Sequence, residues 1–357
     1  MITHALDKLG GWSEIFNSLV QLEGLSFAQS AAAMAEILSG NASDARIAGF
    51  IVALRIKGET VEEVNGMVDA MLAASELLEL GVDAVDLVGT GGSPARRLGA
   101  LNVSTMASFV VSGAGVPVCK HGNRRASSTS GSFDLLEALG VEIELSGESV
   151  ARCVKEVGIG FAFARSFHPA MRFAGPVRAD LGIPTVFNVL GPLSHPSKID
   201  RQVIGVGDPR SIELTAGVLA SRRLPRSLVV HGSDGLDEIT LTGPTTVYEI
   251  REGELSKWQL DPTEYGFALR RGDELRGGDP LDNAEIAKRV FAGEASAARD
   301  IVVLNAAAGL YVGGAVDSIE EGVGLAQASI DDGKAAETLE RLVELTLELS
   351  QAEASQV

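Results

Sequence analysis

The sequence predicts an α/β protein with a small helical domain and a large α/β domain, in which helices flank a central, mostly parallel sheet. Two observations predict this architecture. From Ser26 to about Leu80, apolar residues recur at helical spacing between glycine and asparagine breaks. From Val85 onward, short apolar runs typical of buried strands alternate with helical stretches. That order is expected of a parallel sheet covered by helices.

The elements can be predicted in order along the chain. Several short packed helices are expected before residue 80. A strand at 85–88 ends in glycines, a helix runs from about Ser104 through Val111, and residues 116–119 form the next strand. The alternation continues through residues 135–140, 141–145 and 159–164, strands at 203–206 and 228–231 resume the sheet, and a helical tail starts at about 282. We expect a helical domain at 1–80 with a returning segment at about 169–190, and an α/β domain at 81–168 and 191–357.

Composition excludes several classes of protein. The 357 residues suit one large and one smaller domain, and 48 acidic against 30 basic residues give a formal charge of −18. That charge opposes binding to nucleic acid or to an anionic membrane surface. The two cysteines, Cys119 and Cys153, support neither a disulfide framework nor a zinc site. Without a signal-like start or an apolar run of about 18 residues, we expect a cytoplasmic protein.

One window of this acidic chain is strongly basic. Residues 89–125 hold five basic side chains and no acid, so the window carries a charge of +5. Glycines permit close backbone approach, while hydroxyls, amides and cations bind anions. The sequence therefore predicts a phosphate site here.

The glycine-rich turn at residues 89–92 fits no common nucleotide motif. A dinucleotide fingerprint needs a third glycine where Pro94 stands, and the Gly-Lys-Ser/Thr ending of a P-loop is absent. Taken alone, the turn could simply end a strand. Residues 102–105, Asn-Val-Ser-Thr, could cap a helix, bind an anion, or offer a hydroxyl to Mg²⁺.

Three further segments carry candidate binding groups. The polar loop 120–132 follows a strand, at the sheet edge where ligands bind in such folds, although a solvated basic loop is the alternative. Asp237 and Glu238 are either a surface pair or carboxylates whose repulsion a divalent cation relieves. Arg172 and Arg178 are either helix-surface charges or partners for a carboxylate substrate.

Together these elements resemble the anthranilate phosphoribosyltransferase family over almost the whole chain. Members join anthranilate to phosphoribosyl pyrophosphate in tryptophan biosynthesis. The resemblance rests on the motifs at 89–92, 102–105, 120–123 with Ser127, Ser128 and Ser132, 168–178, 187–193 and 231–238.

The resemblance implies a set of site residues and a homodimer whose small helical domain makes the interface. Anthranilate would contact Gly89, Asn123, His168 and Arg178, with Arg178 engaging its carboxylate. Two Mg²⁺ ions are implied, one held by Ser104 and the second by Asp237 and Glu238, while Lys120 would stabilise the leaving diphosphate. Phosphoribosyl pyrophosphate would be bound by Gly89, Gly92, Ser93, Asn102, Val103, Ser104, Thr105, Lys120, His121, Gly122, Asn123, Arg124, Ser127, Ser128 and Ser132.

One segment departs from the family pattern. Ser93 and Ala100 stand where members usually have aspartate and threonine, and residues 93–101 are about three longer than usual. Arg96 and Arg97 could contact the diphosphate instead. The rival functions are a related transferase or pyrimidine nucleoside phosphorylase with another acceptor, and a non-enzymatic binding paralogue.

Overall fold

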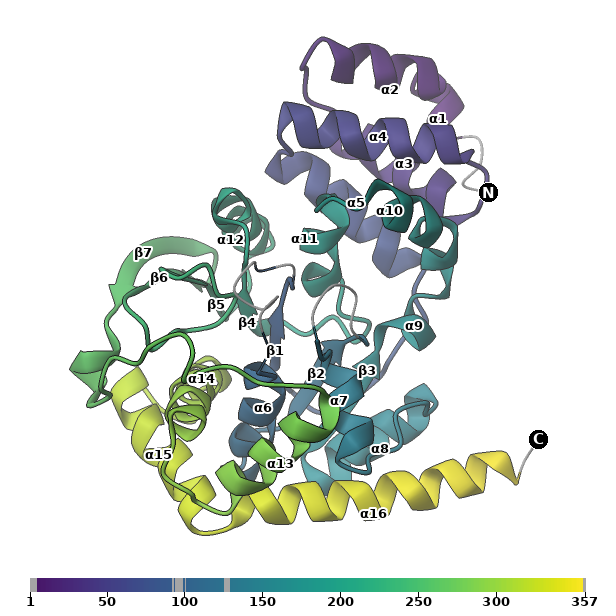
Figure 1. The fold of residues 1–357 in the computed structure, drawn as a ribbon. Coiled ribbons are helices and arrows are strands. Elements are labelled where there is room, and N and C mark those ends of the chain that lie inside the picture. Colours follow the sequence, from purple (N-terminus) through teal and green to yellow (C-terminus); the bar gives the residue numbers. More distant parts are fainter. Residues whose placement is uncertain (1–4, 92, 94–98, 100, 125–128, 356–357) are drawn as a thin grey trace.

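The chain was analysed as a computed structural model that describes residues 5–91, 93, 99, 101–124 and 129–355. Its amino-terminal helices form a bundle at one end of the molecule (Figure 1). Serine and threonine caps begin three of them, because Ser26, Ser43 and Thr60 each accept the backbone N–H three residues further on. The bundle helices are α1 (Ala5–Lys8), α2 (Gly11–Val20), α3 (Phe27–Leu38), α4 (Asp44–Lys57) and α5 (Val61–Ala73).

The main sheet has five strands in the order β1-β4-β5-β6-β7. These are β1 (Asp86–Gly89), β4 (Arg201–Gly205), β5 (Arg226–Gly232), β6 (Thr245–Arg251) and β7 (Glu254–Leu260). The first three are parallel, and β6 and β7 add an antiparallel hairpin. Strands β2 (Val118–Gly122) and β3 (Ile159–Phe163) pair in parallel and meet the main sheet through a parallel bridge between Val85 and Val118. The predicted mostly parallel sheet is confirmed, whereas the hairpin was not predicted.

Helix α6 lies at the centre of the α/β core. Its Phe109 and Val110 are fully buried, and α14, α15 and α16 pack against it (Figure 1). The helices of this part are α6 (Val103–Gly113), α7 (Ser132–Ala138), α8 (Gly147–Val157), α9 (Ala164–Phe167), α12 (Ile212–Ser221), α13 (Pro280–Phe291), α14 (Ala297–Gly313), α15 (Ile319–Asp331) and α16 (Lys334–Ala354).

Residues 141–145 form no strand, although the alternation of strands and helices was expected to continue there. Val141, Ile143 and Leu145 are buried, while the two glutamates between them are exposed. The backbone N–H of Glu142 donates to Thr346 Oγ1 at 3.2 Å. A side chain of α16 thus occupies the place that a neighbouring strand would take.

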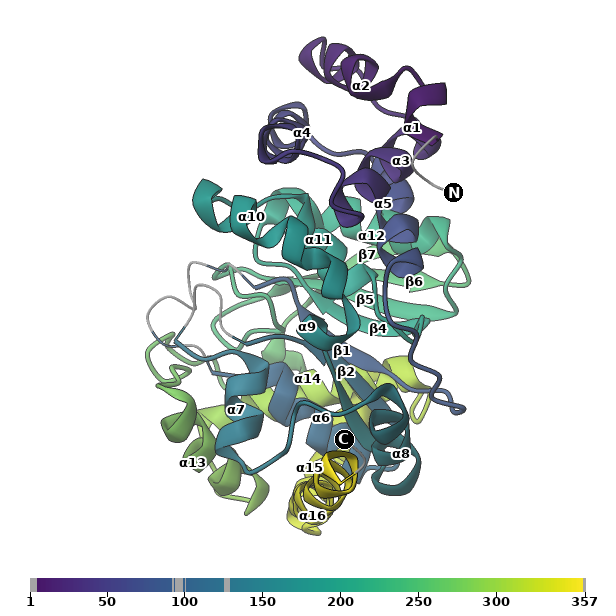
Figure 2. The same ribbon diagram turned by 90° about the vertical axis from the view of Figure 1, so that its right-hand side faces the viewer.

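The segment after His168 returns to the bundle. It comprises a 3₁₀ helix (Pro169–Phe173), α10 (Gly175–Leu181) and α11 (Val186–Leu193). Helix α10 packs on α4, and α11 on α4 and α5, as Figure 2 shows. A second apolar core joins these helices to one face of the main sheet through Val88, Ile204 and Val229. No helix within the described ranges combines the length and apolarity needed to cross a bilayer.

Candidate active site

A cavity of about 800 Å³ opens where β1 and β2 end, and α10 and α11 supply part of its wall. It collects predicted residues from distant parts of the sequence. Of the predicted site residues, those that line it are Gly89, Asn102, Ser104, Thr105, Lys120, His121, Gly122, Asn123, Arg124, Ser132, His168, Arg178 and Asp237.

Three predicted residues lie behind this wall. Ser93 is buried, and its hydroxyl donates to the carbonyl oxygen of Gly235 at 2.5 Å. Val103 packs its side chain into the core, and Glu238 accepts the backbone N–H of Ser104 at 3.3 Å. The predictions for Gly92, Arg96, Arg97, Ser127 and Ser128 fall outside the described residues.

Glycines let the turn after β1 approach Asp237. Gly91 has a left-handed φ of 67° and donates its backbone N–H to Asp237 Oδ2 at 2.9 Å. A Cβ built on Gly89 would overlap the same carboxylate, and one built on Gly205 would overlap the Asp237 carbonyl oxygen. The glycines are therefore required by close packing around an acidic side chain.

Asp237 and Glu238 are buried adjacent carboxylates, with 0% and 4% of their surfaces exposed. Asp237 accepts the backbone N–H of Gly91, and Glu238 accepts that of Ser104. Burying two neighbouring acids is costly unless cations or hydrogen bonds compensate. Within the described ranges, no three His, Cys, Asp or Glu side chains form a metal-binding group. An oxygen set of few protein ligands fits Mg²⁺, which keeps waters and binds substrate phosphates.

Lys120 sits above a buried acid that the sequence analysis missed. Only 2% of Lys120 is exposed, and its Nζ donates to the Leu87 carbonyl oxygen. Asp86 of β1 accepts the backbone N–H of His121 at 3.1 Å and the Gln202 side-chain amide at 3.4 Å. Burial raises the Asp86 pKa to about 7, and the nearby Lys120 ammonium opposes that rise. The sequence did contain a signal for Asp86, because it is an acidic residue inside an otherwise apolar strand.

Three buried histidines lie together: the predicted His121 and His168, and His195, which was not predicted. The ring centroid of His121 lies 5.1 Å from that of His168 and 5.6 Å from that of His195. Burial lowers the pKa of His168 to about 4 and of His195 to about 3, and holds that of His121 well below its usual value. All three rings are therefore neutral at pH 7.

The hydrogen bonds of the His195 ring fix its tautomer. His195 Nε2 lies 2.9 Å from the Cys119 carbonyl oxygen, and its Nδ1 accepts the Ser197 N–H, so Nε2 carries the proton. His121 and His168 each have a backbone hydrogen bond, and the Nε2 atom of each is buried without a partner in the part of the chain that the structure describes. These two nitrogens are therefore shielded from solvent, and the low pKa of both rings makes them weak bases.

Arg178 differs from the other cations of the wall. Its guanidinium carbon lies 5.0 Å from the ring centroid of Phe187, and burial lowers its pKa. No carboxylate of the described residues lies within ion-pair distance of it. Arg124, in contrast, already pairs with Glu137 at 2.6 Å. Arg165 and Arg172 of the wall also have no ion-pair partner among the described residues. The feature that favours Arg178 as the receiver of an anionic ligand is therefore its desolvated position on Phe187.

Comparisons with known proteins agree with this geometry. Residues 81–336 match the model described as "Glycosyl transferase family, a/b domain", and residues 13–75 match "Glycosyl transferase family, helical bundle domain". Anthranilate phosphoribosyltransferase of Rhodococcus jostii is 50% identical over 341 residues, which cover 94% of this chain and 93% of the relative.

Two solved structures share the fold. The crystal structure of anthranilate phosphoribosyltransferase from Thermus thermophilus superposes with a TM-score of 0.87 at 41% identity, over 93% of this chain and 99% of that chain. The Saccharomyces cerevisiae enzyme in complex with PRPP and Mg also gives 0.87, at 29% identity, over 95% and 98%. The predicted fold class, a helical domain plus a large α/β domain, is confirmed.

Proposed function

The chain belongs to the anthranilate phosphoribosyltransferase family, and on that premise we infer the reaction that it catalyses. It transfers the phosphoribosyl group from phosphoribosyl pyrophosphate to the amine of anthranilate. The products are N-(5-phosphoribosyl)anthranilate and pyrophosphate, and the step belongs to tryptophan biosynthesis. The observation that carries this function is the cavity itself, which presents Lys120 and Asp237 beside the glycine turn and a receptive Arg178 on α10.

We assign the donor to the end of the cavity formed by the glycine turn, the start of α6 and the loop after β2. Lys120 supplies a cation there, and the first backbone N–H groups of α6 face an anion favourably. The predicted donor residues that line the cavity support this assignment. The roles of Gly92, Ser93, Val103, Ser127 and Ser128 stay predictions.

We assign the acceptor to the wall formed by His168, Arg178 and Asn123, with Gly89 at its border. The guanidinium of Arg178 can form two parallel hydrogen bonds to the anthranilate carboxylate. Its stacking on Phe187 leaves the edge of the guanidinium group for that ligand. Recognition of the carboxylate explains why an arginine is kept in a partly desolvated position.

Mg²⁺ is the metal of this enzyme. Ser104 and the pair Asp237 and Glu238 fit it, because they offer hard oxygen atoms beside the start of α6. We propose two ions per site, one on Ser104 and one on the carboxylate pair. Bound Mg²⁺ supplies positive charge against the leaving diphosphate.

Transfer breaks the bond between the anomeric carbon and the diphosphate oxygen and forms a bond from that carbon to the anthranilate nitrogen. Lys120 stabilises the negative charge that develops on the diphosphate. The amine is neutral near pH 7, so it needs no base before attack. Afterwards the nitrogen loses a proton, and His121 and His168 line the cavity in which this proton is released.

We propose that the enzyme is a cytoplasmic homodimer joined through the helical bundle. Val20, Leu22 and Ile56 expose 77%, 63% and 73% of their surfaces on that bundle, which supports an interface there. Both cysteines are free and buried, as suits a reducing compartment. Sedimentation equilibrium of the wild-type protein and of Val20→Asp tests the dimer.

The reaction is tested by following anthranilate fluorescence after mixing protein, phosphoribosyl pyrophosphate and Mg²⁺. Signal should fall only in the complete mixture and not when donor or Mg²⁺ is left out. Unchanged fluorescence with folded protein would reject anthranilate as the acceptor and direct the search to other amines or bases.

A further inference from the structure

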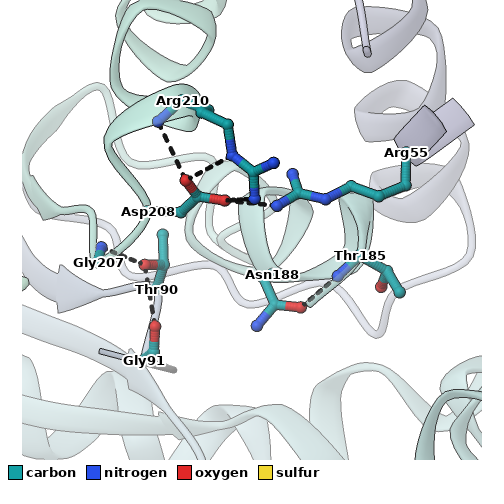
Figure 3. A network of polar contacts seen from close by, with 8 residues as sticks. All are labelled: Arg55, Thr90, Gly91, Thr185, Asn188, Gly207, Asp208 and Arg210. Atoms are coloured by element: carbon teal, nitrogen blue, oxygen red, sulfur yellow. Dashed lines mark hydrogen bonds and ion pairs between the residues drawn. The ribbon is translucent and has the colours of Figure 1, made fainter. Parts of the chain in front are cut away.

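Among the described residues, two ion pairs join the helical bundle to the chain between β4 and β5, Arg222 with Asp69 of α5 and Arg55 with Asp208, and the second lies beside the turn that follows β1. Arg55, in the last turn of α4, donates to Asp208 Oδ2 at 2.5 Å, as Figure 3 shows. The two residues are 153 positions apart and belong to the two matched domains, the bundle and the α/β domain. Their side chains are only 18% and 23% exposed. The pair is therefore shielded from solvent at the junction of the domains.

Asp208 is held in place for this contact. Its carboxylate also accepts hydrogen bonds from the Arg210 backbone N–H and guanidinium group, at 3.0 to 3.1 Å. These bonds and Arg55 lower the Asp208 pKa to about 2. The carboxylate is consequently ionised throughout the neutral range and offers Arg55 a fixed anionic partner.

The residue before Asp208 supports the turn that follows β1. Gly207 donates its backbone N–H to Thr90 Oγ1 at 3.1 Å, and Thr90 Oγ1 donates to the Gly91 carbonyl oxygen at 3.3 Å (Figure 3). A Cβ on Gly207 would lie 3.1 Å from the Ser93 backbone and 3.2 Å from the Gly91 carbonyl oxygen. Gly91 in turn donates to Asp237. A short series of contacts thus runs from α4 to the donor end of the cavity.

We propose that Arg55 and Asp208 are positioning residues for phosphoribosyl pyrophosphate, and that their ion pair holds the turn at Thr90 and Gly91 from the helical bundle. The inference rests on the proposed function for the identity of the donor. Its consequence is selective. Loss of the pair should weaken binding of the donor, because the contacts lead to Thr90 and Gly91 and not to Arg178.

The test compares Arg55→Met with Arg210→Met in steady-state kinetics, with each substrate varied in turn. Arg55→Met should raise KM for phosphoribosyl pyrophosphate about fivefold, as expected for a partly shielded ion pair. KM for anthranilate should stay within about twofold. Arg210 contacts the same carboxylate but is 74% exposed and lies in the α/β domain, so Arg210→Met is the matched control with small effects on both constants.

Three further variants keep the test decisive. Arg55→Lys retains the charge and should recover most of the donor affinity. The double variant Arg55→Met, Asp208→Asn should bind the donor no more weakly than whichever single variant binds it more weakly. The reason is that both substitutions remove the same ion pair, so their effects do not add. If Arg55→Met does not fold, Asp208→Asn reports on the same pair from the other side.

Two outcomes would overturn the inference. One is an unchanged KM for the donor in folded Arg55→Met and Asp208→Asn. The other is a parallel rise in both KM values, which would indicate general loosening of α4 against α10, the helix that carries Arg178. Wild-type turnover in the same assay tests the proposed function separately. Were wild type inactive, equilibrium dialysis of phosphoribosyl pyrophosphate against wild type and Arg55→Met would still decide the inference.

Discussion

Replacement of Arg178 by methionine should weaken anthranilate binding with little effect on phosphoribosyl pyrophosphate. Methionine keeps an unbranched side chain over the Phe187 ring, where the guanidinium carbon now lies 5.0 Å from the centroid, and removes the charge and the hydrogen-bonding fork. In the described part of the chain Arg178 has no carboxylate partner to leave behind. The loss therefore reports on the ligand and not on a broken internal ion pair.

The size of this loss follows from the desolvated position of the guanidinium. Hydrogen bonds to charged groups contribute about 1.5–3 kcal/mol, and about 2 kcal/mol corresponds to a rise of roughly 30-fold in KM for anthranilate. Arg178→Lys keeps the charge but lacks the planar guanidinium fork, so its KM for anthranilate should lie between those of wild type and Arg178→Met. Initial rates from anthranilate fluorescence measure both constants. A rise in KM for phosphoribosyl pyrophosphate with unchanged KM for anthranilate would refute the assignment.

Three other predictions concern the metal site, the glycine packing and the buried histidines. Asp237→Asn combined with Glu238→Gln should lower turnover by about 10²-fold or more, and full turnover at limiting Mg²⁺ would show that neither binds metal. Gly205→Ala should destabilise the protein because its Cβ overlaps Asp237, whereas Gly324→Ala, with open space around the added Cβ, should not lower the melting temperature. The three histidines stay neutral in the folded protein but take up protons in the unfolded chain below about pH 6.5. Their contribution to stability is therefore present above that pH and lost towards pH 4, so replacing one of them by glutamine should reduce the fall in denaturation midpoint between pH 7 and pH 5.

The fold could be predicted where local sequence determines it. Apolar runs ending in glycine located β1, and the polar start of α6 located that helix to within a few residues. The β6–β7 hairpin was missed despite a local signal. Glu252 and Gly253 both have positive φ, 52° and 87°, as a two-residue hairpin turn requires. Gly253 is the residue expected at such a turn, but glutamate rarely adopts a positive φ, so Glu-Gly is a weaker signal than Asn-Gly or Asp-Gly.

The candidate site was predictable only in part. Some of its residues are close together in the sequence, whereas others become neighbours only in the folded protein. Lys120 and Asn123 lie in one basic window, so the sequence shows them together. Asp86 and Gln202 become neighbours only because β1 and β4 pair in parallel, with Asp86 opposite Gln202 in the register. His195 reaches His121 across 74 residues through the tertiary fold. The strand register brings Asp86 and Gln202 together, and burial shifts the pKa values of Asp86 and the histidines. Neither can be read from a single sequence.

The charge of the cavity also explains why an acidic protein can bind two anionic substrates. At physiological ionic strength exposed charges are screened over about 8 Å, so most surface acids contribute little inside the cavity. Among the described lining residues, Lys120 and four arginines face a single carboxylate, Asp237. An acid in such a wall repels a diphosphate unless a cation lies between them. On the proposed assignment of the two substrates, we therefore expect the donor to be recognised as its Mg²⁺ complex, and we expect Arg178 to bind the metal-free carboxylate of the acceptor directly.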